Sequence, residues 1–136
     1  IGCTDGTSTY YEHETGLNQV KEGATTAITA NIESGDFDIG QQGLDGDGEY
    51  MMKIRRIIPD FLAQTGDARI TLNLRDFPND VSVSSSLGPF TITSGTQKID
   101  TRARARSVSL KVDNTSTSQF WRLGTFRLDI QPDGRR

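Results

Sequence analysis

The chain has 136 residues, of which 33% are hydrophobic and 14 are Gly, a composition that suits one compact domain of short strands and turns. Its single cysteine, Cys3, excludes an internal disulfide, and no apolar run reaches the roughly 20 residues of a membrane-spanning helix, so we expect no membrane anchor. The formal net charge of -3 argues against a protein whose whole surface is built to hold nucleic acid.

The charge is divided unequally along the chain. Residues 1–50 hold 10 acidic residues and 1 basic residue, whereas residues 51–136 hold 8 acidic and 14 basic residues. This asymmetry predicts charge-complementary contact, either between the two halves of the chain or between neighbouring copies of it.

Apolar and polar residues alternate with a period of two along most of the chain, and no stretch of a dozen residues shows helical spacing. Strands of this kind have one apolar and one polar face, as antiparallel sheets packed on a single core require. The apolar faces, in chain order, are Ile28, Ala30 and Ile32; Tyr50, Met52 and Ile54; Ile70, Leu72 and Leu74; Phe90 and Ile92; and Phe126, Leu128 and Ile130. Turn clusters separate them at residues 35–36, 44–48, 65–67, 77–80 and 94–96. The sequence therefore predicts an all-β fold, an antiparallel two-sheet β-sandwich or a jelly-roll-like arrangement.

The first two dozen residues are the least patterned part of the chain. Residues 10–14 look like a short strand before a turn at Gly16, and residues 1–6 read like the interior of a longer polypeptide, so we expect a fragment or processed product. We expect residues 1–24 to be the end of a preceding β-rich domain or a linker, and residues 25–136 to form the β-sandwich domain.

Two patterns resemble metal or catalytic motifs. Acidic residues in the segment 45–49 are spaced two apart, as in calcium loops, but Arg56 stands at the twelfth position where such a loop carries a bidentate Glu. His13 is the only histidine, and Leu17 lies where a helical zinc motif would need its second one. Because spacing selects no pair of carboxylates either, we expect no metal, no cofactor and no catalytic residue, and hence a non-enzymatic protein.

Arg102, Arg104 and Arg106 form the sharpest local feature. In a regular strand they share one face with Val108 and Val112, which would extend an apolar face by three charges. Two arrangements resolve this conflict. Either a bulge near residue 107 turns the arginines to solvent, or they line the rim of the core and pair with carboxylates. The candidate partners are Asp60, Asp100 and Asp129.

The arginine row has two interpretations. We favour ion pairs between strands or between subunits. The alternative is a basic stripe that faces DNA phosphates, although no run of exposed aromatic residues accompanies it for base stacking. The further members of that stripe are Lys53, Arg55, Arg56, Arg135 and Arg136.

Trp121 is the only tryptophan, and it precedes the last predicted strand. A tryptophan at this position anchors the core, which we favour because Trp121 and Leu123 share a register, or it forms an interface or glycan platform.

Residues 50–61, 102–106 and 120–136 together resemble the C-terminal regions of virion proteins of short-tailed bacteriophages, which are related to tail nozzle and packaged-DNA stabilisation (tail hub) proteins. The opening is similar to the stretch that leaves a larger, propeller-like β domain in such proteins. The segments that carry this second similarity are residues 4–6, 11–16 and 33–38.

The resemblance implies a structural virion component of the phage tail, in a hexameric ring of identical copies below the portal, around a channel that DNA traverses during ejection. Its implied partners are other copies of itself, neighbouring portal and tail proteins, and DNA. It implies no catalysis, and family members are several times longer than this chain. Candidate subunit or DNA contacts are Arg102, Arg104, Arg106, Arg135 and Arg136. The competing hypothesis is a β-sandwich module that binds glycans or the host surface.

Overall fold

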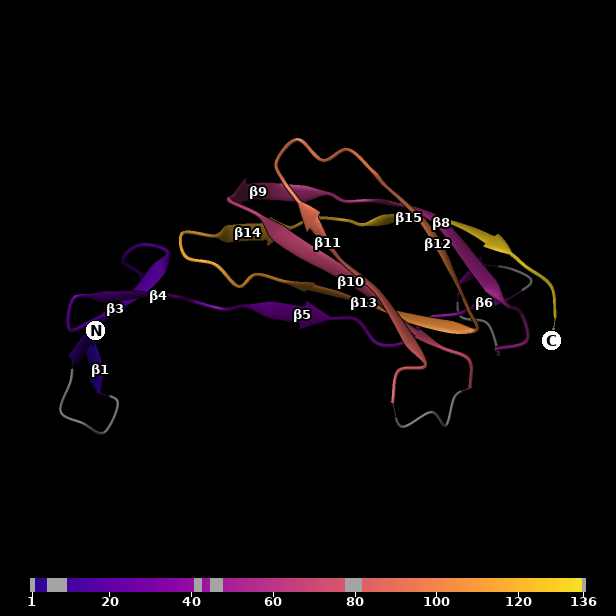
Figure 1. The fold of residues 1–136 in the computed structure, drawn as a ribbon, viewed down its shortest axis with the longest axis horizontal. Coiled ribbons are helices and arrows are strands. Elements are labelled where there is room, and N and C mark those ends of the chain that lie inside the picture. Colours follow the sequence, from indigo (N-terminus) through magenta and orange to yellow (C-terminus); the bar gives the residue numbers. More distant parts are fainter. Residues whose placement is uncertain (1, 5–9, 41–42, 45–47, 78–81, 136) are drawn as a thin grey trace.

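The computed structural model describes residues 2–4, 10–40, 43–44, 48–77 and 82–135, and every regular element within them is a β-strand (Figure 1). The strands are β1 (Gly2–Thr4), β2 (Tyr10–Glu12), β3 (Asn18–Lys21), β4 (Ala24–Ala27), β5 (Asn31–Glu33), β6 (Ile39–Gly40), β7 (Gly43–Leu44), β8 (Met52–Ile58), β9 (Phe61–Thr65), β10 (Ala68–Arg75), β11 (Ser85–Ile92), β12 (Ile99–Ala105), β13 (Ser107–Asp113), β14 (Phe120–Leu123) and β15 (Arg127–Pro132). Within this part of the chain no helix has the length and apolar character of a membrane span.

Two antiparallel sheets form the body of the protein. A four-stranded sheet has the order β11-β10-β13-β5, and a three-stranded sheet has the order β12-β8-β15. Buried side chains from both sheets form one core, so the two sheets pack against each other as a sandwich. The predicted all-β sandwich class is therefore confirmed.

Period-two alternation produces this core. Along β10 the side chains of Ala68, Ile70, Leu72 and Leu74 are buried, and the residues between them are partly exposed. In the opposite sheet β8 buries its own alternate positions, and β12 does the same. The buried side chains of these two strands are Met52, Ile54, Ile57, Ala103 and Ala105.

One predicted apolar face is wrong. Ile28 is 53% exposed and Ile32 is 48% exposed. Ile32 is the register partner of Val112, which is fully buried, and opposed residues of neighbouring strands share a face. Because β5 is the edge strand of its sheet, Ile32 lies at the margin of the core and gains less cover than Val112.

The chain changes sheets at Arg106. Ala103 and Ala105 of β12 are buried, and so are Val108 and Val112 of β13, although odd positions point inward before the bend and even positions after it. β12 belongs to the three-stranded sheet and β13 to the four-stranded sheet, so each strand must present its apolar residues to the core from the opposite side. The structure has a change of sheet here where the sequence predicts a bulge. Arg102 and Arg104 of β12 are exposed, and Arg104 also pairs with the carboxylate of Asp133.

A long two-stranded ribbon connects to the three-stranded sheet. β9 pairs with β14, β8 pairs with β15, and the ribbon bends where Gly124 N donates a hydrogen bond to the Asp60 carbonyl oxygen at 2.8 Å. A Cβ atom at Gly124 would lie 2.9 Å from that oxygen, so the close approach of these two segments of the backbone requires glycine.

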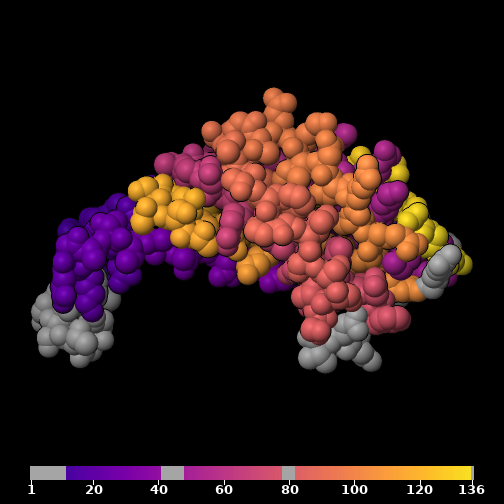
Figure 2. Space-filling model, viewed as in Figure 1, coloured from indigo at the N-terminus to yellow at the C-terminus, as the bar shows by residue number. Residues whose placement is uncertain are grey.

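An arm extends from the sandwich at the N-terminal side. We define the arm as residues 12–27, which include the hairpin formed by β3 and β4, and Figure 2 shows it projecting from the body. The sequence placed a boundary between residues 24 and 25, and that position is the start of β4, inside the hairpin. The first strand that joins the sandwich is β5.

Candidate functional site

The outer surface of the three-stranded sheet is the candidate site. It carries cationic side chains from all three strands, and we call this surface the basic face. Its members are Lys53, Arg55, Arg56, Arg102, Arg104 and Arg127. Their orientation follows from the alternation of the strands, because the residues next to them, such as Ile54 and Ala103, point into the core.

Two cations of this face lie directly opposite each other. Arg104 of β12 is the register partner of Lys53 of β8. Side chains in such positions have Cβ atoms about 4.5–5.5 Å apart, and like charges there are destabilising. Asp133 pairs with Arg104 at this position, whereas the side chain of Lys53 has no hydrogen bond or ion pair among the described residues.

Carboxylates neutralise only part of the basic face. Arg56 Nε lies 3.0 Å from Asp100 Oδ1, Lys98 Nζ lies 3.3 Å from Asp100 Oδ2, and Arg104 Nε pairs with Asp133 Oδ2. Within the described ranges, hydrogen bonds and ion pairs are absent for the side chains of Lys53, Arg55, Arg102 and Arg127. Asp129 is the one further carboxylate beside them, and its side chain has no partner among the described residues either, so the four cations leave the face with a net positive charge.

Asp100 is held in its ionised form. The hydrogen bond from Arg56, and next that from Lys98, keep the pKa of the Asp100 carboxyl below its ordinary value. The two ion pairs therefore keep Asp100 as an anion within the basic face.

A hollow of about 500 Å³ lies in the basic face. The pairing of β8 with each of its two neighbouring strands shifts register at Arg55. The shift lies between Asp100 and Ala103 of β12 and between Asp129 and Ile130 of β15. Register shifts of this kind bend a sheet and redirect side chains, and here Arg55 and Arg56 both face outward although they are adjacent. The residues around the hollow are Lys53, Arg55, Arg56, Asp100, Thr101, Arg102 and Asp129.

The other predicted contact arginines lie elsewhere. Arg106 is partly buried at the crossing between the sheets and donates a hydrogen bond to the Gly48 carbonyl oxygen at 2.8 Å. Arg135 pairs with Glu49 at 2.9 Å, stacks 4.6 Å from the centre of the Tyr50 ring and donates to the Tyr50 hydroxyl. Both side chains have partners within the chain, so they belong to the fold of the sandwich. Arg136 lies outside the described residues.

The expected carboxylate partners of the arginine row are wrong. Asp100 pairs with Arg56 and Lys98, and Asp60 Oδ2 accepts a hydrogen bond from the backbone N–H of Thr125. Asp129 lines the hollow, and its side chain forms no hydrogen bond or ion pair among the described residues. Arg104 instead reaches Asp133, just beyond the end of β15. The pairing depends on which strands are neighbours, and strand order could not be read from the sequence.

The possible metal ligands are not gathered. His13 lies in the arm, residues 45–47 of the acidic segment lie outside the described residues, and the side chain of Cys3 is not described. Among the residues whose positions are described, no three His, Cys, Asp or Glu side chains come close enough to hold a metal ion.

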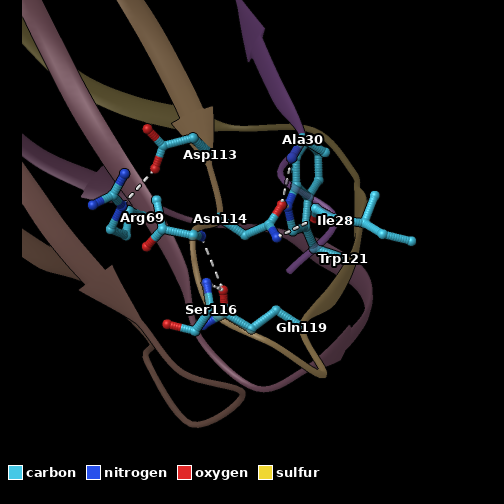
Figure 3. Close-up of polar contacts among 9 residues, drawn as sticks. Ile28, Ala30, Arg69, Asp113, Asn114, Ser116, Gln119 and Trp121 are labelled. Atoms are coloured by element: carbon cyan, nitrogen blue, oxygen red, sulfur yellow. Dashed lines mark hydrogen bonds and ion pairs between the residues drawn. The ribbon is translucent and has the colours of Figure 1, made fainter. Parts of the chain in front are cut away.

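Trp121 lies at the other end of the sandwich. Its ring is partly buried and packs edge-on against Phe61, with ring centroids 6.5 Å apart. Its Nε1–H donates to Asn114 Oδ1 at 3.1 Å (Figure 3). The ring thus packs on the core, and its polar edge is held by a buried amide.

Asn114 is the residue that the sequence analysis missed. It is 3% exposed, its Oδ1 also accepts from the Ala30 N–H at 3.1 Å, and its Nδ2 donates to the Ile28 carbonyl oxygen at 3.0 Å. Figure 3 shows how it ties the segment that leaves the arm to the end of β13. An asparagine after a strand is an ordinary turn signal, so no pattern in the sequence distinguishes it.

A second hollow, of about 280 Å³, lies beside Trp121. Its lining is mostly apolar and comes from the arm, from the segment before β5 and from the loop that leads into β14. The lining residues are Gly16, Leu17, Ile28, Ala30, Asn114, Gln119, Phe120 and Trp121.

Comparison with known proteins adds no relative. A scan against protein-family models finds no match, and a search of curated proteins finds no significantly similar sequence. The interpretation of the site therefore rests on its residues and geometry.

Proposed function

We propose that the chain is a non-enzymatic structural subunit of a phage tail, in a nozzle or hub ring, which acts through contacts between subunits around a DNA channel. The observation that carries the proposal is an exposed sheet face on which four cations have no partner among the described residues, namely Lys53, Arg55, Arg102 and Arg127. A face of this kind is suited to meet an anionic surface, because complementary charges steer the encounter of two surfaces and fix their register.

The sequence resemblance suggests in which assembly this contact forms. Residues 102–106 belong to the segments that resemble tail nozzle and tail hub proteins, and these residues supply two arginines of the basic face. A ring is built from identical copies that present complementary surfaces on different sides. In such a ring the anionic partner is a neighbouring subunit, and DNA in the channel is a further partner of the same charge.

Electron microscopy of the phage particle that contains this sequence tests the proposal. We expect the sandwich to occupy a ring of the tail, with its basic face against a neighbouring subunit or lining the channel. Density for the sandwich in the capsid shell, or its absence from the particle, would contradict the proposal.

Substitutions on the face give a second test. Arg102→Glu and Arg104→Glu are expected to impair assembly of the tail while the purified protein remains folded. Arg102 is the cleaner site, because Arg104→Glu also removes the ion pair with Asp133. The matched control is Arg122→Glu, an exposed arginine of β14 outside the basic face. Normal assembly of the Arg102→Glu variant would argue against the proposed role of the face.

The second candidate, a module that binds glycans, is favoured by the apolar hollow beside Trp121. Sugar rings stack on exposed aromatic faces, and Phe120 is 44% exposed there. A panel of host-surface oligosaccharides, titrated against the protein and its Phe120→Ala variant, separates the two functions. Saturable binding that is lost in the variant would favour the glycan module.

A further inference from the structure

The arm carries unpaired negative charge. Glu12, Glu14 and Glu22 are exposed, and within the described part of the chain their side chains form no hydrogen bond or ion pair. The only Lys or Arg of the arm is Lys21. The arm is thus an acidic surface, opposite in sign to the basic face.

The arm also lacks the cover that a stable hairpin needs. β3 and β4 form a two-stranded sheet of their own, and such a hairpin is only marginally stable in water without a further layer. Val20 in β3 is 59% exposed, and Ile28, just after β4, is 53% exposed. A partner that packs on the hairpin would bury these apolar side chains.

The base of the arm is attached to the sandwich. Asn18 Nδ2 donates to the Ser118 hydroxyl at 3.0 Å, and the Ser118 N–H donates to Asn18 Oδ1. With the Asn114 contacts to residues 28 and 30, these bonds give the arm a defined direction. A surface held in this way loses less conformational entropy on binding than a free tail does.

The arm cannot neutralise the basic face of its own chain. In Figure 1 the hairpin β3–β4 lies at one end of the long axis, and the strands β8, β12 and β15 extend toward the other end. Figure 2 shows the arm as a projection away from the body. Both charged surfaces of a single copy therefore remain open.

The geometry points to an interface in which the acidic arm of one copy docks on the basic face of the next copy. Glutamates 12, 14 and 22 would face the unpaired cations Lys53, Arg55 and Arg102. Because two different surfaces meet, the contact is head-to-tail, and it closes into a ring or continues as a chain. The inference rests on the proposed function and names the surfaces through which its subunits join.

A second copy fits both surfaces better than nucleic acid does. DNA would neutralise the basic face, but it would leave the three arm glutamates unpaired and would repel them. The net charge of -3 adds to that repulsion. Each copy carries an acidic arm and a basic face, so neighbouring copies can neutralise both surfaces.

Charge reversal of each surface tests the interface. One variant carries Arg55→Glu with Arg102→Glu, and the other carries Glu14→Lys with Glu22→Lys. None of these four side chains has a partner among the described residues, so both variants are expected to keep the unfolding midpoint of the wild type. Sedimentation velocity over a concentration series should show self-association of the wild type, weakened about tenfold or more in each variant.

Mixing the two variants provides the decisive measurement. Each variant alone opposes like charges at the interface, whereas the mixture pairs acidic arms with basic faces and basic arms with acidic faces. We expect the mixture to associate as the wild type does, and Arg122→Glu to leave association unchanged. Wild-type association should also weaken between about 0.1 M and about 1 M salt, a measurement that needs no variant.

The outcomes separate this inference from the proposed function. If the reversed variants associate as the wild type does, or the mixture fails to associate, the arm-to-face interface is wrong, although a ring seen by microscopy would still support the tail role. If the wild type stays monomeric at every concentration and binds a short DNA duplex that the Arg55→Glu and Arg102→Glu variant does not bind, the basic face serves nucleic acid, and the interface is overturned.

Discussion

The buried amide of Asn114 accepts a hydrogen bond from Trp121 Nε1 at 3.1 Å, and it thereby joins the aromatic end of the sandwich to the segment that leaves the arm. The same side chain bonds the backbone of Ala30 and Ile28, so three polar groups are satisfied by one residue. A buried polar group without a partner is destabilising, which makes this asparagine a structural requirement for the position of the arm.

Asn114→Ala is expected to lower the free energy of unfolding by about 2–3 kcal/mol, because it leaves the Trp121 N–H and two backbone groups without their partner. Urea unfolding followed by tryptophan fluorescence measures the loss. Asn31→Ala, at an exposed position of β5, is the control and should change the free energy by less than about 0.5 kcal/mol. Equal effects of the two substitutions would contradict the role of the amide.

Leu72→Ala is expected to destabilise the sandwich by about 2–5 kcal/mol. Leu72 is fully buried in β10, which lies between β11 and β13, so truncation leaves a cavity between the sheets. Thermal and urea unfolding give the difference. Leu62 is 69% exposed, and Leu62→Ala should have little effect. A comparable loss of stability at both positions would contradict the assignment of Leu72 to the core.

Gly124→Ala is expected to destabilise the protein by about 1–3 kcal/mol, since the added Cβ would lie 2.9 Å from the Asp60 carbonyl oxygen and push the ribbon apart. Gly35→Ala is the matched control, because no atom lies within 4 Å of a Cβ placed there. Unfolding midpoints that are the same for both variants would show that the ribbon is not closely packed at Gly124.

Acid should weaken the hydrogen bonds that the Glu33 carboxylate accepts from Ser109 and Asn73. Hydrogen bonds from Ser109, and next from Asn73, hold the pKa of Glu33 below its ordinary value of 4.5, so the folded state binds fewer protons there than the unfolded state. The resulting stabilisation is present above pH 4.5 and is lost as the pH falls through the lowered pKa.

Glu33→Gln isolates this contribution. The stability difference between the wild type and the variant should shrink as the pH falls from neutral to below 4.5, as measured by urea unfolding at several pH values. A difference that stays constant with pH would mean that the carboxylate is not stabilised in the folded state.

Much of the candidate site could be predicted from local alternation. Arg102 and Arg104 alternate with Ala103 and Ala105, and β12 turns the arginines outward and the alanines inward. What the alternation could not predict is that Lys53 lies opposite Arg104, because that register joins residues far apart in the chain. The bulge that turns both Arg55 and Arg56 outward has the same non-local origin.

Alternation along the chain was enough to predict that this protein is built of strands and which side chains share a face, because the two-residue period is a property of the local backbone. Which of those faces are covered depends on how the sheets pack. Ile70 and Ile28 belong to equally regular apolar patterns, yet Ile70 is fully buried and Ile28 is 53% exposed. Burial depends on a second sheet supplied by distant parts of the chain, and only the folded arrangement brings that sheet into place.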